Sequence, residues 1–143
     1  MTFLSKTNFV HTTANIATVL FALFIGMQLL LATGILPVSI AWGGRQTELT
    51  PTLRVASIVA AIILGIFLYI IRHRAGLTGS ESIPIAIRIS SWVVTAYMAF
   101  NTLGNLASTS NTEKLLFGPI TFLLTIACII ISVSKINSAK GLE

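Results

Sequence analysis

Long apolar runs alternate with short polar segments along the whole chain. A transmembrane helix needs about 20 apolar residues to cross roughly 30 Å of hydrocarbon. Charged residues lie only near the ends of these runs and are absent from their hydrophobic middles. The pattern predicts helices over residues 14–37, 51–71, 84–107 and 111–134, within a single transmembrane domain that covers residues 1–143.

Local signals support the starts of the second and fourth helices. Thr50-Pro51 is typical of an N-cap followed by the first helical position. Residues 110–113, Ser-Asn-Thr-Glu, have the spacing of a capping box, so the fourth helix is expected to begin near Asn111. Gly118-Pro119 then falls inside that helix and is expected to kink it.

Composition agrees with a membrane location. The 143 residues are 55% hydrophobic and only 9% charged, with a mean hydropathy of +0.92, whereas a soluble domain carries about 25% charged residues. So few charges cannot cover a surface in water, which excludes the soluble globular, disordered and fibrous classes. We therefore expect an all-α membrane protein, an antiparallel four-transmembrane-helix bundle with short connections.

The basic residues are distributed unequally between the two sides of such a bundle. An even number of spans puts both termini on the same side. That side carries Lys6, Arg72, Arg74, Arg88, Lys135 and Lys140, and the opposite side carries Arg45, Arg54 and Lys114. The positive-inside rule then predicts a multi-pass protein with both termini cytoplasmic. Because topology accounts for the basic excess, we expect no nucleic-acid partner.

Few side chains in this chain are suited to catalysis or metal binding. The single cysteine, Cys128, excludes an internal disulfide and a multi-thiolate metal site. His11 and His73 have no acid or thiol nearby and the chain has no Asp, so we expect no metal and no cofactor. The middles of the spans carry no ionisable residue, which disfavours an ion-coupled transporter and a membrane enzyme.

Small and hydrogen-bonding residues indicate how the helices pack, because such residues mediate helix association in lipid. Each predicted helix has one stripe of them at helical spacing. The first helix carries Thr18, Ala22 and Gly26, and the second carries Ser57, Ala61 and Gly65. The third carries Ser90, Tyr97, Asn101, Gly104, Asn105 and Ser108, and the fourth carries Gly118, Thr121, Thr125, Cys128 and Ser132. We expect these faces to pack together and the remaining apolar surfaces to face lipid.

Polar residues also gather at the extracytoplasmic ends of the predicted helices. They lie in the first outer loop (residues 42–54), at the end of the third helix (101–108) and at the start of the fourth (113–119). We expect these three segments to converge. The candidate ligand- or partner-binding residues are Trp42, Arg45, Glu48, Arg54, Tyr97, Asn101, Asn105 and Glu113.

Arg54 is the most informative of these residues. It lies about one turn inside the second helix, where a cation pairs, faces the bundle or extends toward water. Glu48 and Glu113 are the only acids on its side of the membrane. One interpretation is a structural knot that ties the first outer loop to the third and fourth helices. Another is a pocket in which Arg45 or Arg54 receives an anionic or polar head group. The third is that the Arg54 side chain simply extends toward water without a partner.

Two weaker signals have two interpretations each. Trp42-Gly43-Gly44 is either a plain tight turn or a turn that brings backbone amides close to a ligand. Gln28 is the only strong hydrogen-bonding group deep in the first helix. It is therefore either a contact between helices or a contact to a ligand.

Two segments carry a resemblance to other proteins. WGGRQTELTPTLRVAS (residues 42–57) and NTLGNLAS with TEKLLFGP (within residues 101–119) resemble the recurring pattern of a group of small bacterial four-span membrane proteins. The resemblance covers roughly residues 42–119. It implies a location in the bacterial inner (plasma) membrane, and it transfers no activity, catalytic residue or binding residue.

These observations favour a non-enzymatic integral membrane protein whose extracytoplasmic polar face binds a partner protein, a lipid or a small polar or anionic ligand. The alternative is a small homo-oligomeric channel or facilitator with an uncharged polar path lined by Tyr97, Asn101, Asn105 and Ser108. A third interpretation is a membrane enzyme that uses Glu48 or Glu113. The expected partners are membrane lipids, with a membrane protein or a second copy of the chain as further candidates.

Overall fold

The computed structural model describes residues 3–79 and 82–136, and in these residues all regular structure is helical. Four long helices are joined by connections that contain short helical turns. The elements are α1 (Phe3–Thr33), η1 (Val38–Ile40), η2 (Trp42–Gly44), α2 (Pro51–Arg74), α3 (Ile85–Ala107), η3 (Glu113–Phe117) and α4 (Gly118–Val133). For these residues, the expectation of an all-helical fold with four long helices is confirmed.

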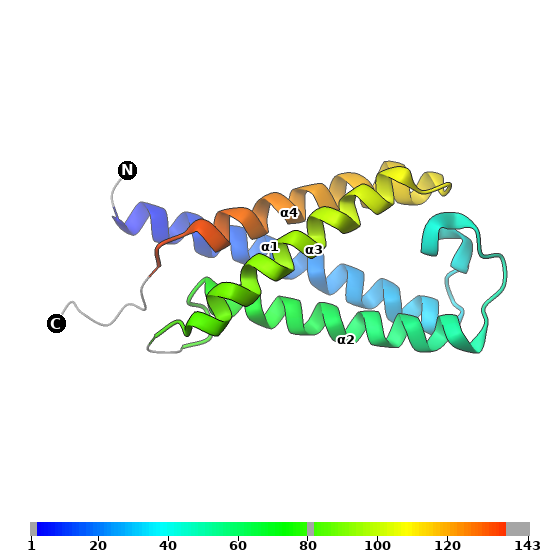
Figure 1. The fold of residues 1–143 in the computed structure, drawn as a ribbon, viewed down its shortest axis with the longest axis horizontal. Helices are drawn as coiled ribbons and strands as arrows, with labels where there is room; N and C mark the ends of the chain where they lie inside the picture. Colours follow the sequence, from blue (N-terminus) through cyan, green and yellow to red (C-terminus); the bar gives the residue numbers. More distant parts are fainter. Residues whose placement is uncertain (1–2, 80–81, 137–143) are drawn as a thin grey trace.

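α1 and α2 form one antiparallel hairpin, and α3 and α4 form another (Figure 1). The start of α1, the loop between α2 and α3, and the end of α4 lie at one end, which we call the terminal end. The opposite end, which we call the connection end, holds residues 34–50 and 108–112. There the two hairpins are apart, and η1 and η2 lie between them (Figure 1).

In the described residues, three helical segments are long and apolar enough to cross a membrane. They are Lys6–Thr33, Pro51–Arg74 and Glu113–Val133. The sequence analysis predicted four such segments, and the third of them, now α3, is not in this set. The reason is that α3 carries several polar side chains, among them Ser91, Asn101 and Asn105, which lower its hydropathy.

α1 is longer at its start and shorter at its end than predicted. It begins at Phe3 rather than near residue 14, because no glycine or proline interrupts residues 3–25. It ends at Thr33 rather than at residue 37, because Gly34 adopts the left-handed conformation (φ 82°) that stops a helix. Both differences depend on where glycine and proline occur, because these residues control the backbone conformation. Hydropathy alone does not include this effect.

α2 begins where the sequence predicts. The Thr50 hydroxyl accepts a hydrogen bond from the Leu53 N–H at 3.2 Å, and Pro51 occupies the first turn. The helix continues past the predicted end at residue 71 and stops at Arg74, just before Gly76 takes a left-handed conformation (φ 75°). The basic segment at residues 72–74 therefore belongs to the helix rather than to the loop after it.

The fourth helix begins at Asn111, as predicted, but its first turns are irregular. Residues 113–117 form a π-helical turn, in which the Gly118 N–H bonds the Glu113 carbonyl. Pro119 has no N–H and so cannot maintain a regular α-helical ladder at this point. The distortion that the sequence predicted is present just before the proline, as η3.

The main apolar core extends from the middle of the bundle to its terminal end. It is built from residues between 10 and 21, 64 and 75, 83 and 98, and 124 and 136. Phe21, Met98 and Leu124 are fully buried in it. The connection half of the bundle is therefore organised by other contacts.

Polar side chains join α3 to α4 inside the bundle. Thr102 Oγ1 lies 3.2 Å from Thr125 Oγ1, and Asn105 Nδ2 donates to Thr121 Oγ1 at 3.2 Å. All four side chains are buried. Hydrogen bonds between helices in lipid contribute about 0.6 kcal/mol each on average, so these contacts specify the alignment of α3 and α4 as much as they stabilise it.

The predicted contact faces are correct on α4 and only partly correct elsewhere. Every residue of the predicted α4 stripe is buried. On α1, however, the buried face carries Ala14, Ala17 and Phe21, while Ala22 is exposed. On α3, Tyr97 is 46% exposed and Met98 is buried. The prediction assumed that small residues mark the faces where helices approach closely. In this bundle, large apolar side chains such as Phe21 and Met98 also fill the centre.

Ala17→Leu is expected to destabilise the protein, whereas Ala22→Leu is expected to leave its stability nearly unchanged. Ala17 is fully buried and Ala22 is exposed, so only the first leucine must displace core atoms. Overpacking of this kind costs about 1–3 kcal/mol. Unfolding of the purified variants in detergent, followed by circular dichroism, measures the difference. A larger loss in Ala22→Leu would show that α1 packs through its other face.

Candidate functional site

The α1–α2 connection makes a strained turn at η2. Trp42, Gly43 and Gly44 have positive φ angles of 56°, 79° and 71°. A residue with a side chain costs about 1–2 kcal/mol in the left-handed region, so surrounding contacts must hold Trp42 there. Gly44 has a further constraint, because a Cβ atom at this position would lie 2.6 Å from the Ser110 backbone nitrogen. The turn thus packs directly against the α3–α4 connection.

Glu113, at the start of the fourth helix, binds this turn. The Gly43 N–H donates to both carboxylate oxygens, to Oε1 at 3.2 Å and to Oε2 at 3.1 Å. The Ser108 hydroxyl also donates to Oε2, and Thr109 Oγ1 donates to the Gly43 carbonyl at 2.7 Å. We call this group of contacts the Gly43–Glu113 clasp. It ties the connections of the two hairpins together.

The clasp explains why the predicted capping box is only half formed. The Ser110 hydroxyl accepts the Glu113 N–H at 3.4 Å, as the motif requires. In a complete box the Glu113 carboxylate would return to the Ser110 N–H. That N–H instead donates to Ser108 Oγ at 2.9 Å, because the carboxylate is engaged by Gly43.

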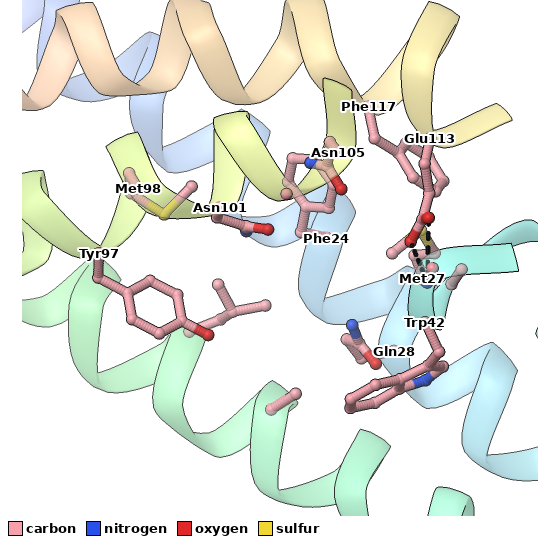
Figure 2. A pocket seen from close by; sticks show the side chains of 15 residues that line it. Phe24, Met27, Gln28, Trp42, Tyr97, Met98, Asn101, Asn105, Glu113 and Phe117 are labelled. Atoms are coloured by element: carbon pink, nitrogen blue, oxygen red, sulfur yellow. Dashed lines mark hydrogen bonds between the residues drawn. The ribbon is translucent and has the colours of Figure 1, made fainter. Parts of the chain in front are cut away.

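A pocket of about 400 Å³ lies beside the clasp, between the separated hairpins (Figure 2). Residues of α1, α2, η2, α3 and η3 form its wall. The wall combines amide side chains with aromatic ones, namely Gln28, Asn101 and Asn105 with Phe24, Trp42, Tyr97 and Phe117. The volume lies within the range of small-molecule sites, which is about 300–1,000 Å³.

Two amides in this wall have no protein partner among residues 3–79 and 82–136. The Gln28 Oε1 atom is buried and accepts no hydrogen bond, and the half-buried Asn101 side chain forms none. Asn105, by contrast, donates to Thr121. A buried polar atom that is left unpaired costs about 1–3 kcal/mol. Water or a ligand in the pocket is therefore expected to satisfy Gln28 and Asn101.

The pocket contains only some of the predicted site residues. Its wall includes Trp42, Tyr97, Asn101, Asn105 and Glu113. The wall does not include Arg45, Glu48 or Arg54. The aromatic and amide members of the predicted set are thus brought together around one cavity, while its two arginines lie outside that cavity.

Arg54 has a different contact from the one that its position suggested. Its Nη1 donates to the Ala32 carbonyl at 3.2 Å, where the last turn of α1 leaves carbonyl groups without helical partners. In the part of the chain that the structure describes, it forms no ion pair with Glu48 or Glu113. The predicted tie between the two connections exists, but Gly43 and Glu113 form it. The negative end of the α1 dipole attracts the guanidinium instead.

Some residues of the pocket were not identified from the sequence. Phe24 and Met27 resemble the lipid-facing residues of the same helix, and only the packing of α1 turns them toward the cavity. Gln28 did carry a signal, as a lone amide in an apolar helix, and the structure places it in the pocket wall. No group of three or more His, Cys, Asp or Glu side chains is placed to hold a metal ion in the described residues.

Gly44→Ala is expected to destabilise the protein more than Gly43→Ala. Both glycines have positive φ, so alanine at either position costs about 1–2 kcal/mol. At Gly43 a Cβ atom would meet nothing within 4 Å, whereas at Gly44 it would meet the backbone of Ser110. We expect a further loss of about 1–3 kcal/mol for Gly44→Ala, measured by denaturant unfolding. Equal losses would contradict the close approach of the two connections.

Comparison with protein-family models, with curated proteins and with solved structures found no match for this chain. The resemblance of residues 42–57 and 101–119 to small bacterial four-span membrane proteins therefore stays an expectation. The function is accordingly inferred from the residues and the geometry of the pocket.

Proposed function

We propose that this chain is an integral membrane protein that binds a small polar molecule in the pocket beside the Gly43–Glu113 clasp. One observation carries the proposal. Gln28 and Asn101 contribute to the wall of a formed cavity and have no hydrogen-bond partner among the residues described. Membrane insertion and ligand binding have separate support.

The distribution of polar and apolar side chains supports membrane insertion. Large apolar side chains are exposed on every helix, for example Leu23 (63%), Ile62 (59%), Phe100 (74%) and Leu123 (58%). Hydroxyl groups such as that of Thr121 are buried instead. A monomeric protein in water rarely exposes large continuous apolar surfaces, whereas a bundle in lipid has this arrangement.

The same distribution supports α3 as a fourth membrane span. Thr102 and Asn105 are buried and bonded to α4, while Val93, Phe100 and Leu103 are exposed. Polar groups inside a membrane helix are tolerated when neighbouring helices satisfy them. The low hydropathy of α3 thus reflects its inner face rather than the surface that would meet lipid.

The charges favour an orientation with both termini cytoplasmic, and the resemblance of residues 42–119 implies the bacterial inner membrane. Among the described residues, the terminal end carries Lys6, Arg72, Arg74, Arg88 and Lys135, and the connection end carries Arg45, Arg54 and Lys114. Lys140, which was counted with the first group, lies outside the described residues. The excess of Lys and Arg is expected on the cytoplasmic side. The pocket then lies in the extracytoplasmic half of the bilayer.

Gln46→Cys is expected to react with a membrane-impermeant maleimide in intact cells, and Thr78→Cys only after the membrane is permeabilised. Both positions are exposed and lie at opposite ends of the bundle. The native Cys128 is buried and provides a low background. Labelling of both positions from the same side would contradict the proposed insertion.

Packing favours binding over conduction through the interior of a single bundle. The polar wall of the pocket meets the apolar core, in which Met98 and Leu124 are fully buried. Asn105 and Ser108, two residues of the alternative polar path, are already bonded to side chains of the fourth helix. A path along the bundle would therefore meet apolar side chains before it reached the terminal end.

Gly104→Leu is expected to abolish ligand binding, whereas Gly65→Leu is expected to retain it. A Cβ atom at either glycine would meet nothing within 4 Å, so both variants should fold. Gly104 lines the pocket, and Gly65 lies on α2 outside its wall. A leucine at Gly104 therefore fills space that a ligand needs.

The measurement is thermal stabilisation of the purified protein against a panel of neutral, cationic and anionic small polar molecules. A ligand at a hundredfold excess over its Kd adds about 2.7 kcal/mol to the free energy of unfolding. Failure of every panel member to stabilise the wild type would contradict ligand binding. Stabilisation that survives Gly104→Leu would place the site elsewhere, and solute flux through reconstituted vesicles would favour the channel.

A further inference from the structure

We propose that the ligand of this pocket is a small organic cation, whose ammonium group is recognised by the Glu113 carboxylate and by aromatic rings. The inference rests on the proposed binding function and adds the charge and the chemical class of the ligand. Its starting point is the charge of the wall. Of the described residues that line the pocket, Glu113 alone carries a formal charge.

The hydrogen bonds of Glu113 are those of an ionised carboxylate. The Gly43 N–H donates to both of its oxygens. The Ser108 hydroxyl donates to Oε2, and the Ser108 oxygen also accepts the Ser110 N–H. Every one of these contacts treats the Glu113 carboxyl as an acceptor, which is the only role of the ionised form.

This negative charge lacks a basic partner in residues 3–79 and 82–136. Glu113 is only 6% exposed, and it forms no ion pair with the basic residues of the connection end. Arg54 is engaged by Ala32, and Arg45 and Lys114 are exposed and outside the pocket wall. A buried carboxylate without a cation is costly, so a positively charged ligand in the adjoining cavity would offset that cost. An anionic ligand would add to it.

The aromatic side chains of the wall suit the same ligand. Trp42 and Tyr97 lie on opposite sides of the cavity (Figure 2). Phe24 and Phe117 pack edge to face, with ring centroids 5.7 Å apart, and also line it. A cation over an aromatic face gains about 0.5–2 kcal/mol, most when it is removed from water. Aromatic rings beside a carboxylate therefore select an ammonium group over a neutral group of the same shape.

The unpartnered amides complete the description of the ligand. The Gln28 Oε1 atom is an acceptor with no donor, and Asn101 offers an acceptor and a donor. A hydroxyl or amide on the ligand, away from its ammonium group, would satisfy them. The class that fits is thus a small ammonium compound with a polar tail.

Three probes of similar size, each with three methyl groups on one central atom but with different net charges, test this inference. They are choline, its neutral carbon isostere 3,3-dimethylbutan-1-ol, and the anionic 3,3-dimethylbutanoate. The full chain with Trp92→Phe is purified in a maltoside detergent, whose neutral head group carries no ammonium group to compete with choline. Trp42, in the pocket wall, is then the only tryptophan, and its fluorescence reports binding. We expect choline to bind about tenfold or more tightly than the alcohol, as desolvated cation–π and carboxylate contacts predict.

Glu113→Gln and Glu48→Gln form a matched pair of variants. Each removes one negative charge at the connection end, but only Glu113 lines the pocket, and Glu48 is exposed. We expect Glu113→Gln to lose the preference for choline over the alcohol and Glu48→Gln to keep it. The comparison of the three probes on the chain with native Glu113 decides the inference even if Glu113→Gln does not fold.

Each outcome has a defined meaning. Equal affinity for choline and the alcohol, tighter binding of the anion, or a preference that survives Glu113→Gln would overturn the cationic ligand. None of these results would contradict ligand binding in the pocket. That proposal is supported if any molecule of the panel stabilises the wild type but not Gly104→Leu. If none of the three probes binds, the cationic inference fails, and the panel alone decides whether the pocket binds another class of molecule.

Discussion

The connections of the two hairpins meet at the Gly43–Glu113 clasp, in which the Gly43 amide donates hydrogen bonds to the Glu113 carboxylate. The residues are 70 positions apart in the chain, and they belong to the connections of different hairpins. The ribbons of the two hairpins are apart at this end, with η1 and η2 between them (Figure 1). Trp42, which precedes Gly43, has a left-handed conformation, and the Glu113 carboxylate bonds Gly43 rather than the Ser110 N–H at the start of its own helix. The clasp also provides one wall of the pocket.

The apolar core and the pocket lie in different halves of the bundle. The half toward the terminal end is filled by the apolar core around Phe21, Met98 and Leu124. The other half keeps a cavity with amides, aromatic rings and one carboxylate. A cavity of this kind would weaken a bundle that relied on packing along its whole length. Here the core and the clasp join the hairpins at opposite ends, and the space between them stays open.

α3 shows why polar residues can mislead a reading of hydropathy. Its sequence averages an apolar outer face with an inner face that carries Thr102 and Asn105. The inner face bonds α4, so its polar groups are not those that a surrounding lipid would meet. Hydropathy sums both faces, and only the position of each side chain in the bundle separates them.

By itself the sequence determined the helical class, the N-cap at Thr50 and the start of the fourth helix near Asn111, because these follow from composition and from residues adjacent in the chain. It also selected Trp42, Asn101 and Glu113, whose polar or aromatic character stands out at the helix ends. Tertiary structure alone decided which groups meet. Adjacent residues point about 100° apart around a helix, so the rotation of α1 within the bundle decides that Phe21 rather than Ala22 enters the core. Likewise, Arg54 bonds the end of α1 while Glu113 binds Gly43, because the packing of four helices sets these distances and no local pattern encodes them.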